Sequence, residues 1–177
     1  MKTLNTYINE WKINGKSIEN IDKEDHSKYF NSKYFIYKID KEEKFKIFET
    51  EWPQYDYYAR KVYVNGEHIF VDYGRTEDYY DPGEYEIEIK DINNINNCDG
   101  MFWGCHDLIS VPYFDTSKVR NFKYMFDGCS SLENVPLLNI KNAVNMENMF
   151  DGCNRLNTKT KNSWSKIYDF IKRDKKI

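Results

Sequence analysis

The sequence lacks a long apolar run. No segment approaches the roughly 18 consecutive apolar residues that a membrane-spanning helix requires. The opening residues, MKTLNTYINEWKING, contain neither a continuous apolar stretch nor a small-residue cleavage site, which a secretory signal combines. We therefore expect no signal peptide, no membrane insertion and a location in the cytoplasm of the producing cell rather than at its surface.

Cysteine and net charge are also scarce. Four cysteines in 177 residues are too few for a disulfide scaffold, and no pair has the C-x-x-C spacing typical of zinc sites. The formal net charge of −3 disfavours nucleic-acid binding as the main activity. We expect reduced thiols, no bound metal, no cofactor and no nucleic-acid partner.

Catalytic motifs are missing as well. His26, His68 and His106 are scattered, and the sequence contains neither a phosphate-binding loop nor a nucleophile elbow. The prediction is a protein without enzymatic activity and without catalytic residues. An enzyme stays open as an alternative if a pocket joins His68 or Asp72 to a cysteine with a strongly shifted pKa.

The first half of the sequence is rich in strand patterns. Residues 3–11 can form a short amphipathic helix. From about residue 33 to residue 92, apolar and polar residues alternate with a period of two, which is typical of strands. Asn65-Gly66 between two aromatic and β-branched runs is the strongest short hairpin signal, and residues 84–90 alternate strictly. Five strands of an antiparallel sheet are predicted, at residues 33–39, 44–49, 59–64, 67–71 and 84–90, the first two as a hairpin.

The second half repeats with a period of 24 residues. One repeat reads N-x-x-x-M-F-x-G-C-x-x-L-x-x-V-P, and the cysteines of the three copies are Cys105, Cys129 and Cys153. Such a period is typical of leucine-rich repeats, whose single coils cannot bury their apolar side alone. Because a catalytic thiol is needed once and a core residue in every coil, the repeated cysteine indicates a core position. Residues 162–173 place Trp164, Ile167, Tyr168 and Ile171 on one helical face, which suits a lid over the last coil.

The predicted fold class is mostly β: a small antiparallel β domain, then a short leucine-rich-repeat solenoid of about three 24-residue coils with a C-terminal helical cap. The predicted organisation is an N-terminal helix and linker (1–20), the β domain (21–92), the repeat coils (93–158), and the capping helix with a basic tail (159–177).

The stretch MFWGCHDLISVPYFDTSKVRNFKYMFDGCSSLENVP (101–136) resembles the BspA-type leucine-rich-repeat family. The resemblance implies a β-rich solenoid without enzymatic activity that makes protein contacts, often on bacterial surfaces or in adhesion. The opening MKTLNTYINEWKING is similar to short openings of proteins encoded by gut bacteriophages, which implies a place in the virion or in the infected cell.

The leading functional prediction is therefore a non-enzymatic protein–protein interaction module, phage-encoded as a virion or host-interaction protein; the alternative is a BspA-type surface adhesin. In the leucine-rich pattern, six residues face the concave surface, and Phe114 beside Leu138 forms an exposed apolar strip for a protein partner or for self-association. These candidate partner-binding residues are Ser110, Pro112, Phe114, Asn134, Pro136 and Leu138. The alternative left open is that they pack beneath the β domain or the helix.

Overall fold

The computed structural model describes residues 12–13, 16–17, 32–49 and 61–175. The helix predicted over residues 3–11 lies outside these ranges. Two short strands, β1 (Lys12–Ile13) and β2 (Lys16–Ser17), pair antiparallel near the N-terminus.

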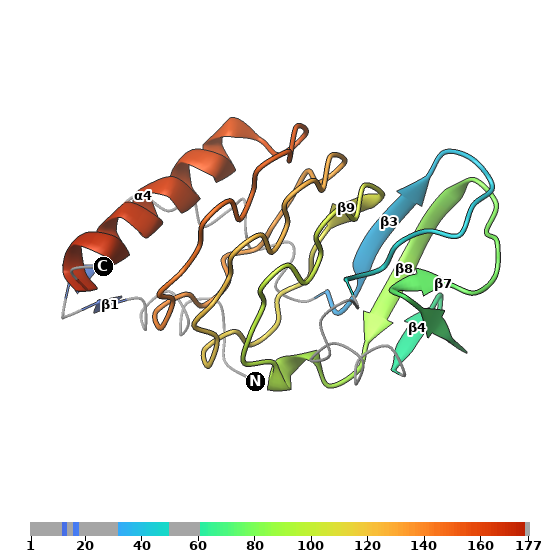
Figure 1. Cartoon of the computed structure of the whole chain (residues 1–177), viewed down its shortest axis with the longest axis horizontal. Coiled ribbons are helices and arrows are strands. Elements are labelled where there is room, and N and C mark those ends of the chain that lie inside the picture. Colours follow the sequence, from blue (N-terminus) through green and yellow to red (C-terminus); the bar gives the residue numbers. More distant parts are fainter. Residues whose placement is uncertain (1–11, 14–15, 18–31, 50–60, 176–177) are drawn as a thin grey trace.

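A five-stranded antiparallel sheet forms the first part of the described chain (Figure 1). Its strand order is β5-β4-β8-β3-β9, and the strands are β3 (Phe35–Ile39), β4 (Val62–Val64), β5 (Glu67–Ile69), β8 (Gly83–Ile89) and β9 (Leu108–Ser110). Asn65 and Gly66 connect β4 to β5 with φ of 48° and 88°, so the predicted tight hairpin is confirmed. The alternation predicted for β8 is also confirmed, because Ile87 and Ile89 are buried and Glu84 and Glu86 are exposed.

The hairpin predicted between residues 33–39 and 44–49 is wrong. Strand β3 pairs with β8 and β9 instead. Residues 43–46 make only isolated bridges, Glu43 with Tyr80 and Lys46 with Arg75. The physical reason is burial: Phe45, Ile47 and Phe48 are all buried, which a hairpin strand with one exposed face does not allow. A small pair, β6 (Val71–Asp72) and β7 (Arg75–Thr76), completes this region.

The leucine-rich-repeat solenoid predicted for residues 93–158 is wrong as well. The structure is a small antiparallel sheet with one α-helix, α4 (Thr158–Lys175), and its sheets do not curl. Residues 93–158 contain one strand, β9, which joins the sheet through β3 rather than through a strand of the next repeat. The β-type pairing that the described residues show between neighbouring repeats consists of two isolated parallel bridges, Ser110–Asn134 and Asn121–Asn145. Prolines at 112 and 136 remove ladder donors directly after the would-be strands, which explains why no longer strands form.

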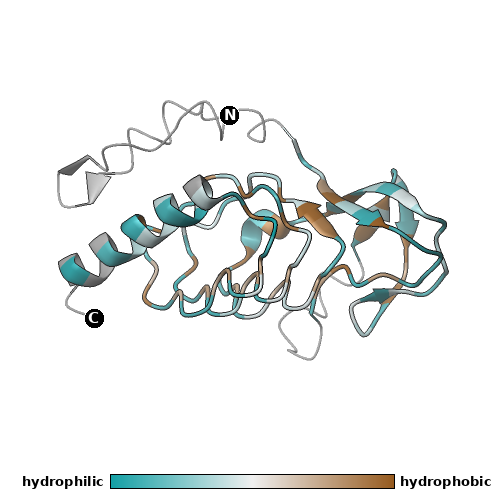
Figure 2. Ribbon diagram, turned by 90° about the horizontal axis from the view of Figure 1, so that it is seen from above, coloured by the Kyte–Doolittle hydropathy of each residue, from teal (hydrophilic) through white to brown (hydrophobic). Residues whose placement is uncertain are grey.

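Each 24-residue repeat consists mainly of turns rather than strands. Figures 1 and 2 show the repeats as a row of loops between the sheet and α4, after a short 3₁₀ turn, η2 (Ile92–Asn94). Each repeat donates four backbone hydrogen bonds of 2.8–3.0 Å to the next one. In the first repeat the bonds run from Cys98, Gly100, Phe102 and Gly104 to Asn121, Lys123, Met125 and Asp127; in the second, from Phe122, Tyr124, Phe126 and Gly128 to Asn145, Glu147, Met149 and Asp151. Residues 24 apart therefore occupy equivalent places.

Equivalent side chains form ladders through the row. The rings of Phe102, Phe126 and Phe150 stack with centroids 5.5 and 5.6 Å apart and planes within 9° of parallel. The series continues to Trp164 of α4, 5.7 Å from Phe150. Burying one such large side chain contributes on the order of 1.5–3 kcal/mol. These ladders are therefore a main source of stability in this half.

The repeated asparagines satisfy turn backbone groups. The Oδ1 atoms of Asn97, Asn121 and Asn145 each accept the N–H of the residue two positions on, at 3.1, 3.0 and 3.0 Å. Among the residues that the structure describes, no helix combines the length and the apolar character that a membrane span needs.

The glycine before the third repeated cysteine, Gly152, allows the close approach of neighbouring backbones. Gly128 and Gly152 have φ of 75° and 67°. A Cβ atom on Gly152 would lie 3.0 Å from the Gly128 Cα and 3.1 Å from its nitrogen, so the neighbouring backbone would have to shift by a few tenths of an ångström. Two constraints therefore require glycine here, the left-handed backbone and the contact.

Replacing Gly152 tests this contact. Gly152→Ala is expected to lower the free energy of unfolding in urea by more than Gly66→Ala. Both residues have positive φ and share the left-handed penalty of about 1–2 kcal/mol. A Cβ on Gly66 meets nothing within 4 Å, so that variant is the matched control. Equal losses for the two variants would contradict the close packing of the repeats.

Candidate functional site

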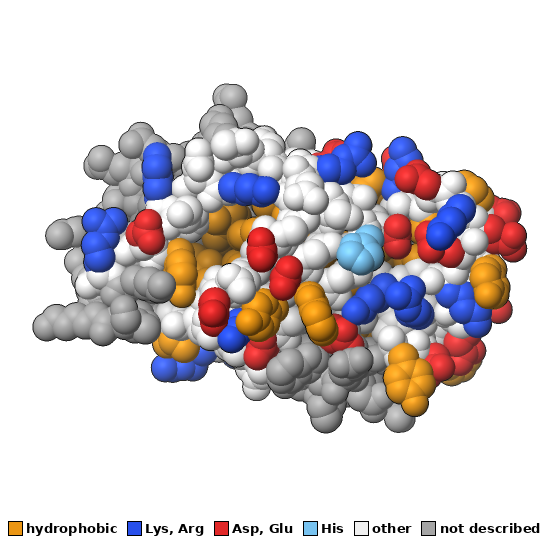
Figure 3. All heavy atoms as spheres, turned by 45° about the horizontal axis from the view of Figure 1, so that its top comes forward, with side chains coloured by type: hydrophobic (Ala, Val, Ile, Leu, Met, Phe, Trp, Pro, Cys, Tyr) orange, Lys and Arg blue, Asp and Glu red, His pale blue; other side chains and the backbone are white. Residues whose placement is uncertain are grey.

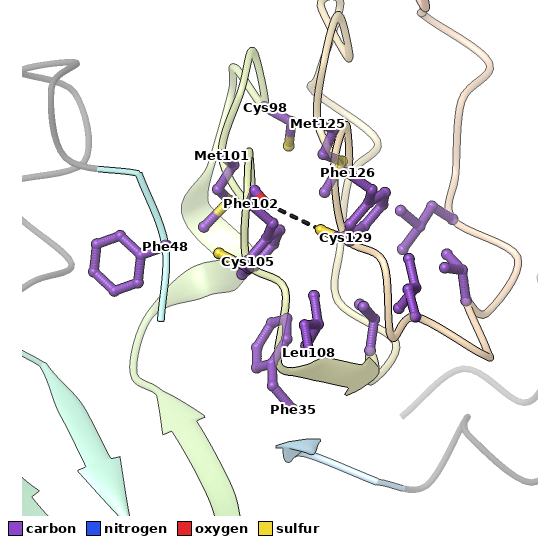
Figure 4. Close-up of a cluster of buried hydrophobic side chains, with 14 of the residues drawn as sticks. Phe35, Phe48, Cys98, Met101, Phe102, Cys105, Leu108, Met125, Phe126 and Cys129 are labelled. Carbon is purple, nitrogen blue, oxygen red and sulfur yellow. Dashed lines mark hydrogen bonds between the residues drawn. The ribbon is translucent and has the colours of Figure 1, made fainter. Parts of the chain in front are cut away.

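The four cysteines are buried free thiols in or beside the repeat ladders. The Cys129 Sγ donates to the carbonyl oxygen of Phe102 at 3.0 Å, and the Cys153 Sγ donates to that of Phe126 at 3.0 Å. Figure 4 shows Cys129 directed toward Phe102 of the preceding repeat, beside the stacked phenylalanine rings. The repeated cysteine therefore fills core volume and satisfies a backbone carbonyl.

Burial suppresses thiolate formation at these cysteines. Desolvation raises the pKa of Cys98, Cys105 and Cys129 far above the ordinary value and raises the pKa of Cys153 to about 12. The thiolate is the nucleophilic form of cysteine. His106, which follows Cys105 in sequence, places its Nδ1 2.8 Å from the Gly128 carbonyl oxygen, so its ring serves the backbone of the next repeat. This arrangement does not favour nucleophilic chemistry.

The other residues considered for an enzyme lie apart from the cysteines. His68 is exposed on β5, with its ring edge-on to those of Tyr63 and Phe70. Asp72 is exposed on β6. His26 lies outside the described ranges. Within those ranges no three His, Cys, Asp or Glu side chains are grouped as a metal site would require.

The six predicted partner-binding residues lie mostly in the interior. Phe114 and Leu138 are completely buried, and Phe114 packs against Phe35 of β3 with ring centroids 6.0 Å apart. Ser110, Pro112 and Pro136 are buried too, and Asn134 is half-buried.

The expected exposed strip is therefore absent at these positions. The reason is that β9 joins the sheet: Ser110 pairs with Ile36, which brings the following residues beneath β3. Phe114, which packs against Phe35, follows the alternative that these residues pack beneath the β domain or the helix.

An apolar groove lies instead between the third repeat and α4. We call it the α4 groove; its volume is about 220 Å³, and its lining residues are Met146, Met149, Phe150, Lys161, Trp164, Ser165 and Tyr168. Figure 3 shows hydrophobic side chains at the floor of a hollow on the side of the molecule where α4 lies. One wall comes from the third repeat, with Met146, Met149 and Phe150, and the other comes from α4.

The chemistry of the α4 groove is that of a binding surface. Two thioethers and three aromatic rings supply adaptable apolar area, because methionine fills irregular contacts well and aromatic side chains dominate interface energetics. Lys161 adds one cation, and Ser165 adds a hydroxyl. Sequence reasoning missed this site, although one signal was present: the 24-residue period stops after the third repeat, so that repeat has no following copy to cover it.

Large exposed aromatic side chains also occur elsewhere, at Phe70, Tyr73, Tyr79 and Trp103. The Trp103 ring is covered in part by the Lys46 ammonium, 5.7 Å from its centroid, and the Tyr79 ring similarly faces Lys44. Single exposed apolar side chains are normal on protein surfaces. The α4 groove is thus the better candidate, because its apolar side chains converge on one hollow.

The buried thiols predict a specific loss of stability at high pH. The Cys153 pKa lies near 9.0 when the residue is unperturbed and at about 12 in the folded protein. Because the folded-state pKa is raised, the protonated thiol contributes fully to the free energy of unfolding below pH 9. That contribution is lost as the pH rises from 9 toward 12. Urea unfolding at pH 8, 9 and 10 is therefore expected to show a falling free energy of unfolding, by up to about 1.4 kcal/mol per pH unit for each such group.

The variant Cys153→Ala provides the control for this pH dependence. It is less stable than the unchanged protein at pH 8, but its free energy of unfolding falls less steeply above pH 9 because one titrating thiol is gone. Identical slopes for the two proteins would contradict the burial of the Cys153 thiol.

One comparison with known proteins gives a match. A family model described as "Mycoplasma protein of unknown function, DUF285" matches residues 78–171, just over half of the chain. The matched stretch contains β8, β9, all three repeats and most of α4. No curated protein and no solved structure matches the chain.

Proposed function

The chain belongs to the DUF285 family, and from this premise we propose that it is a non-enzymatic protein-interaction module that binds its partner in the α4 groove. The family description assigns no activity, so the proposal rests on the geometry of this chain. The observation that carries it is the position of the groove, at the end of the repeat row and beside α4, where apolar side chains line a hollow.

The composition of the groove supports binding over catalysis. Small-molecule sites typically have volumes of roughly 300–1,000 Å³ and bring several polar groups to one point. The α4 groove is smaller, at about 220 Å³, and its ionisable side chains are Lys161 and Tyr168. Thioether and aromatic linings are typical of surfaces that take up a side chain of another protein.

The proposal includes a biological setting. The protein is a phage-encoded component of the virion or contacts a host factor in the infected cell, and either role is consistent with a protein that acts by binding other proteins. Kinship with BspA-type proteins is proposed on the residues of the 101–136 stretch. The partner is a protein, either a different one or a second copy of this chain.

A pair of variants on α4 tests the proposal. Ser165 is exposed and lines the groove, whereas the next residue, Lys166, is exposed and does not line it. Ser165→Trp is expected to fill the groove and to reduce recovery of a specific partner about tenfold or more, which corresponds to roughly 1.4 kcal/mol of binding free energy. Lys166→Trp is the matched control and is expected to retain the partner.

The measurement is affinity purification of each tagged variant from the native host, followed by quantitative mass spectrometry. Recovery of the same proteins at the same level with both variants would contradict the groove as the binding site. Thermal unfolding of both variants checks that the fold is intact, which we expect because Ser165 and Lys166 are exposed.

A further inference from the structure

The third repeat presents three backbone donors that have no acceptor in the part of the chain that the structure describes. In the first and second repeats, four N–H groups donate to the following repeat. The equivalent groups of the third repeat belong to Met146, Asn148, Phe150 and Gly152. The Gly152 N–H is satisfied by the Asp151 Oδ1 at 3.0 Å, whereas the N–H groups of Met146, Asn148 and Phe150 have no acceptor among the described residues. We call these three groups the donor edge.

The helix that follows the third repeat does not satisfy the donor edge. The carbonyl groups in the body of an α-helix are used in its own hydrogen bonds. Helix α4 covers the phenylalanine ladder through Trp164, whose ring takes the place of a fourth phenylalanine beside Phe150. It therefore closes the ladder of rings but leaves the backbone edge open.

The donor edge and the α4 groove occupy the same place. Met146 and Phe150 contribute both an edge N–H and a lining side chain. Trp164, which also lines the groove, is buried, and its indole N–H has no acceptor in the described part of the chain. Buried tryptophan N–H groups normally have a partner. An apolar hollow bordered by unused donors therefore calls for an occupant that supplies carbonyl oxygens.

The chain itself shows what fits such an edge. Residues 145–151 cover the equivalent edge of the second repeat, where the carbonyl groups of alternate residues accept the bonds. That segment reads NMENMFD, with apolar Met149 and Phe150 between acidic Glu147 and Asp151. A peptide of this character is also complementary in charge to Lys161 of the groove.

We propose that the α4 groove and the donor edge together bind an extended peptide segment of a partner protein. Alternate main-chain carbonyls of the peptide accept hydrogen bonds from Met146, Asn148 and Phe150, one large apolar side chain fills the groove, and a neighbouring acidic side chain pairs with Lys161. This is edge addition of the kind by which peptides extend exposed sheets. The inference rests on the proposed function and specifies the chemistry of the partner.

A synthetic peptide provides the first test. The probe is a fluorescently labelled peptide with the sequence of residues 145–153 in which Cys153 is replaced by Ser. Fluorescence anisotropy is expected to show saturable binding to the full chain. Ser165→Trp weakens this binding at least tenfold, and Lys166→Trp leaves it within twofold. Absence of saturable binding up to about 1 mM protein, or binding of a scrambled peptide with equal affinity, would overturn the proposal.

Removal of a single backbone donor provides the decisive test. Replacing Phe150 by its α-hydroxy analogue converts the backbone N–H to an ester oxygen and keeps the side chain. The same replacement at Phe126 removes an N–H that donates to the Met149 carbonyl oxygen at 3.0 Å. Both esters also weaken the preceding carbonyl group as an acceptor, so both lower the melting temperature.

The two ester variants are expected to separate stability from binding. The Phe126 ester loses an internal bond as well and melts at the lower temperature of the two, but it binds the peptide within twofold of the unchanged chain. The Phe150 ester binds about fivefold more weakly, which corresponds to one lost hydrogen bond. Unchanged affinity of the Phe150 ester would rule out edge addition.

The two proposals fail in distinguishable ways. Loss of the native partner in Ser165→Trp, together with full affinity of the Phe150 ester, would keep the groove as an interaction site and reject edge addition. Retention of the native partner in Ser165→Trp would reject the groove itself.

Discussion

A ladder of backbone hydrogen bonds joins residues 24 apart, and the second half of the protein depends on it. Each repeat donates from alternate residues to the carbonyl groups of the next repeat, as from Phe102 to Met125 and from Phe126 to Met149. Because this ladder fixes the register, side chains at equivalent positions lie above one another. The stacked phenylalanine rings and the cysteine thiols that donate to the preceding repeat are consequences of that register.

The ladder of alternate residues, from Cys98 to Gly104 and from Phe122 to Gly128, runs in one direction, which makes its two ends different. Along the segments that begin at Cys98 and Phe122, the earlier repeat donates and the later one accepts, whereas bonds such as Glu133 N–H to Ile109 O and Val144 N–H to Arg120 O run the other way elsewhere in the repeats. At the first repeat, the acceptor side meets the N-terminal part of the chain, where the Glu49 N–H donates to the Met101 carbonyl oxygen at 2.8 Å. At the third repeat, α4 covers the rings but supplies no backbone acceptor. This asymmetry leaves donors and an apolar groove together at one end, and the proposed binding role follows from it.

The sequence predicts local structure well where one short pattern determines it. Asn65-Gly66 requires a turn with positive φ, and the strict alternation of residues 84–90 requires a strand with one buried face. The period of 24 correctly indicates equivalent environments, and the helical face of residues 162–173 indicates the terminal helix. In each case the determining residues are neighbours in sequence or identical copies.

The failures concern contacts between distant segments. Residues 44–49 have the composition of a hairpin strand, but burial of Phe45 and Phe48 by other parts of the chain removes them from the sheet. A repeat period near that of leucine-rich repeats does not ensure strands, and here turns carry the ladder. Phe114 and Leu138 are buried because β9 pairs with β3, which no local pattern reveals. The α4 groove depends on how the helix crosses the last repeat, so its position is also a tertiary property.

The most direct test of the ladder is amide hydrogen exchange of the full chain, measured residue by residue by NMR. Amides with a partner in the next repeat exchange slowly, through larger openings of the structure. Those of Phe102, Gly104, Phe126 and Gly128 are therefore expected to be protected, and those of Asn148 and Phe150 to exchange rapidly. Equal protection of the third-repeat amides, or rapid exchange throughout the first two repeats, would contradict the directional ladder.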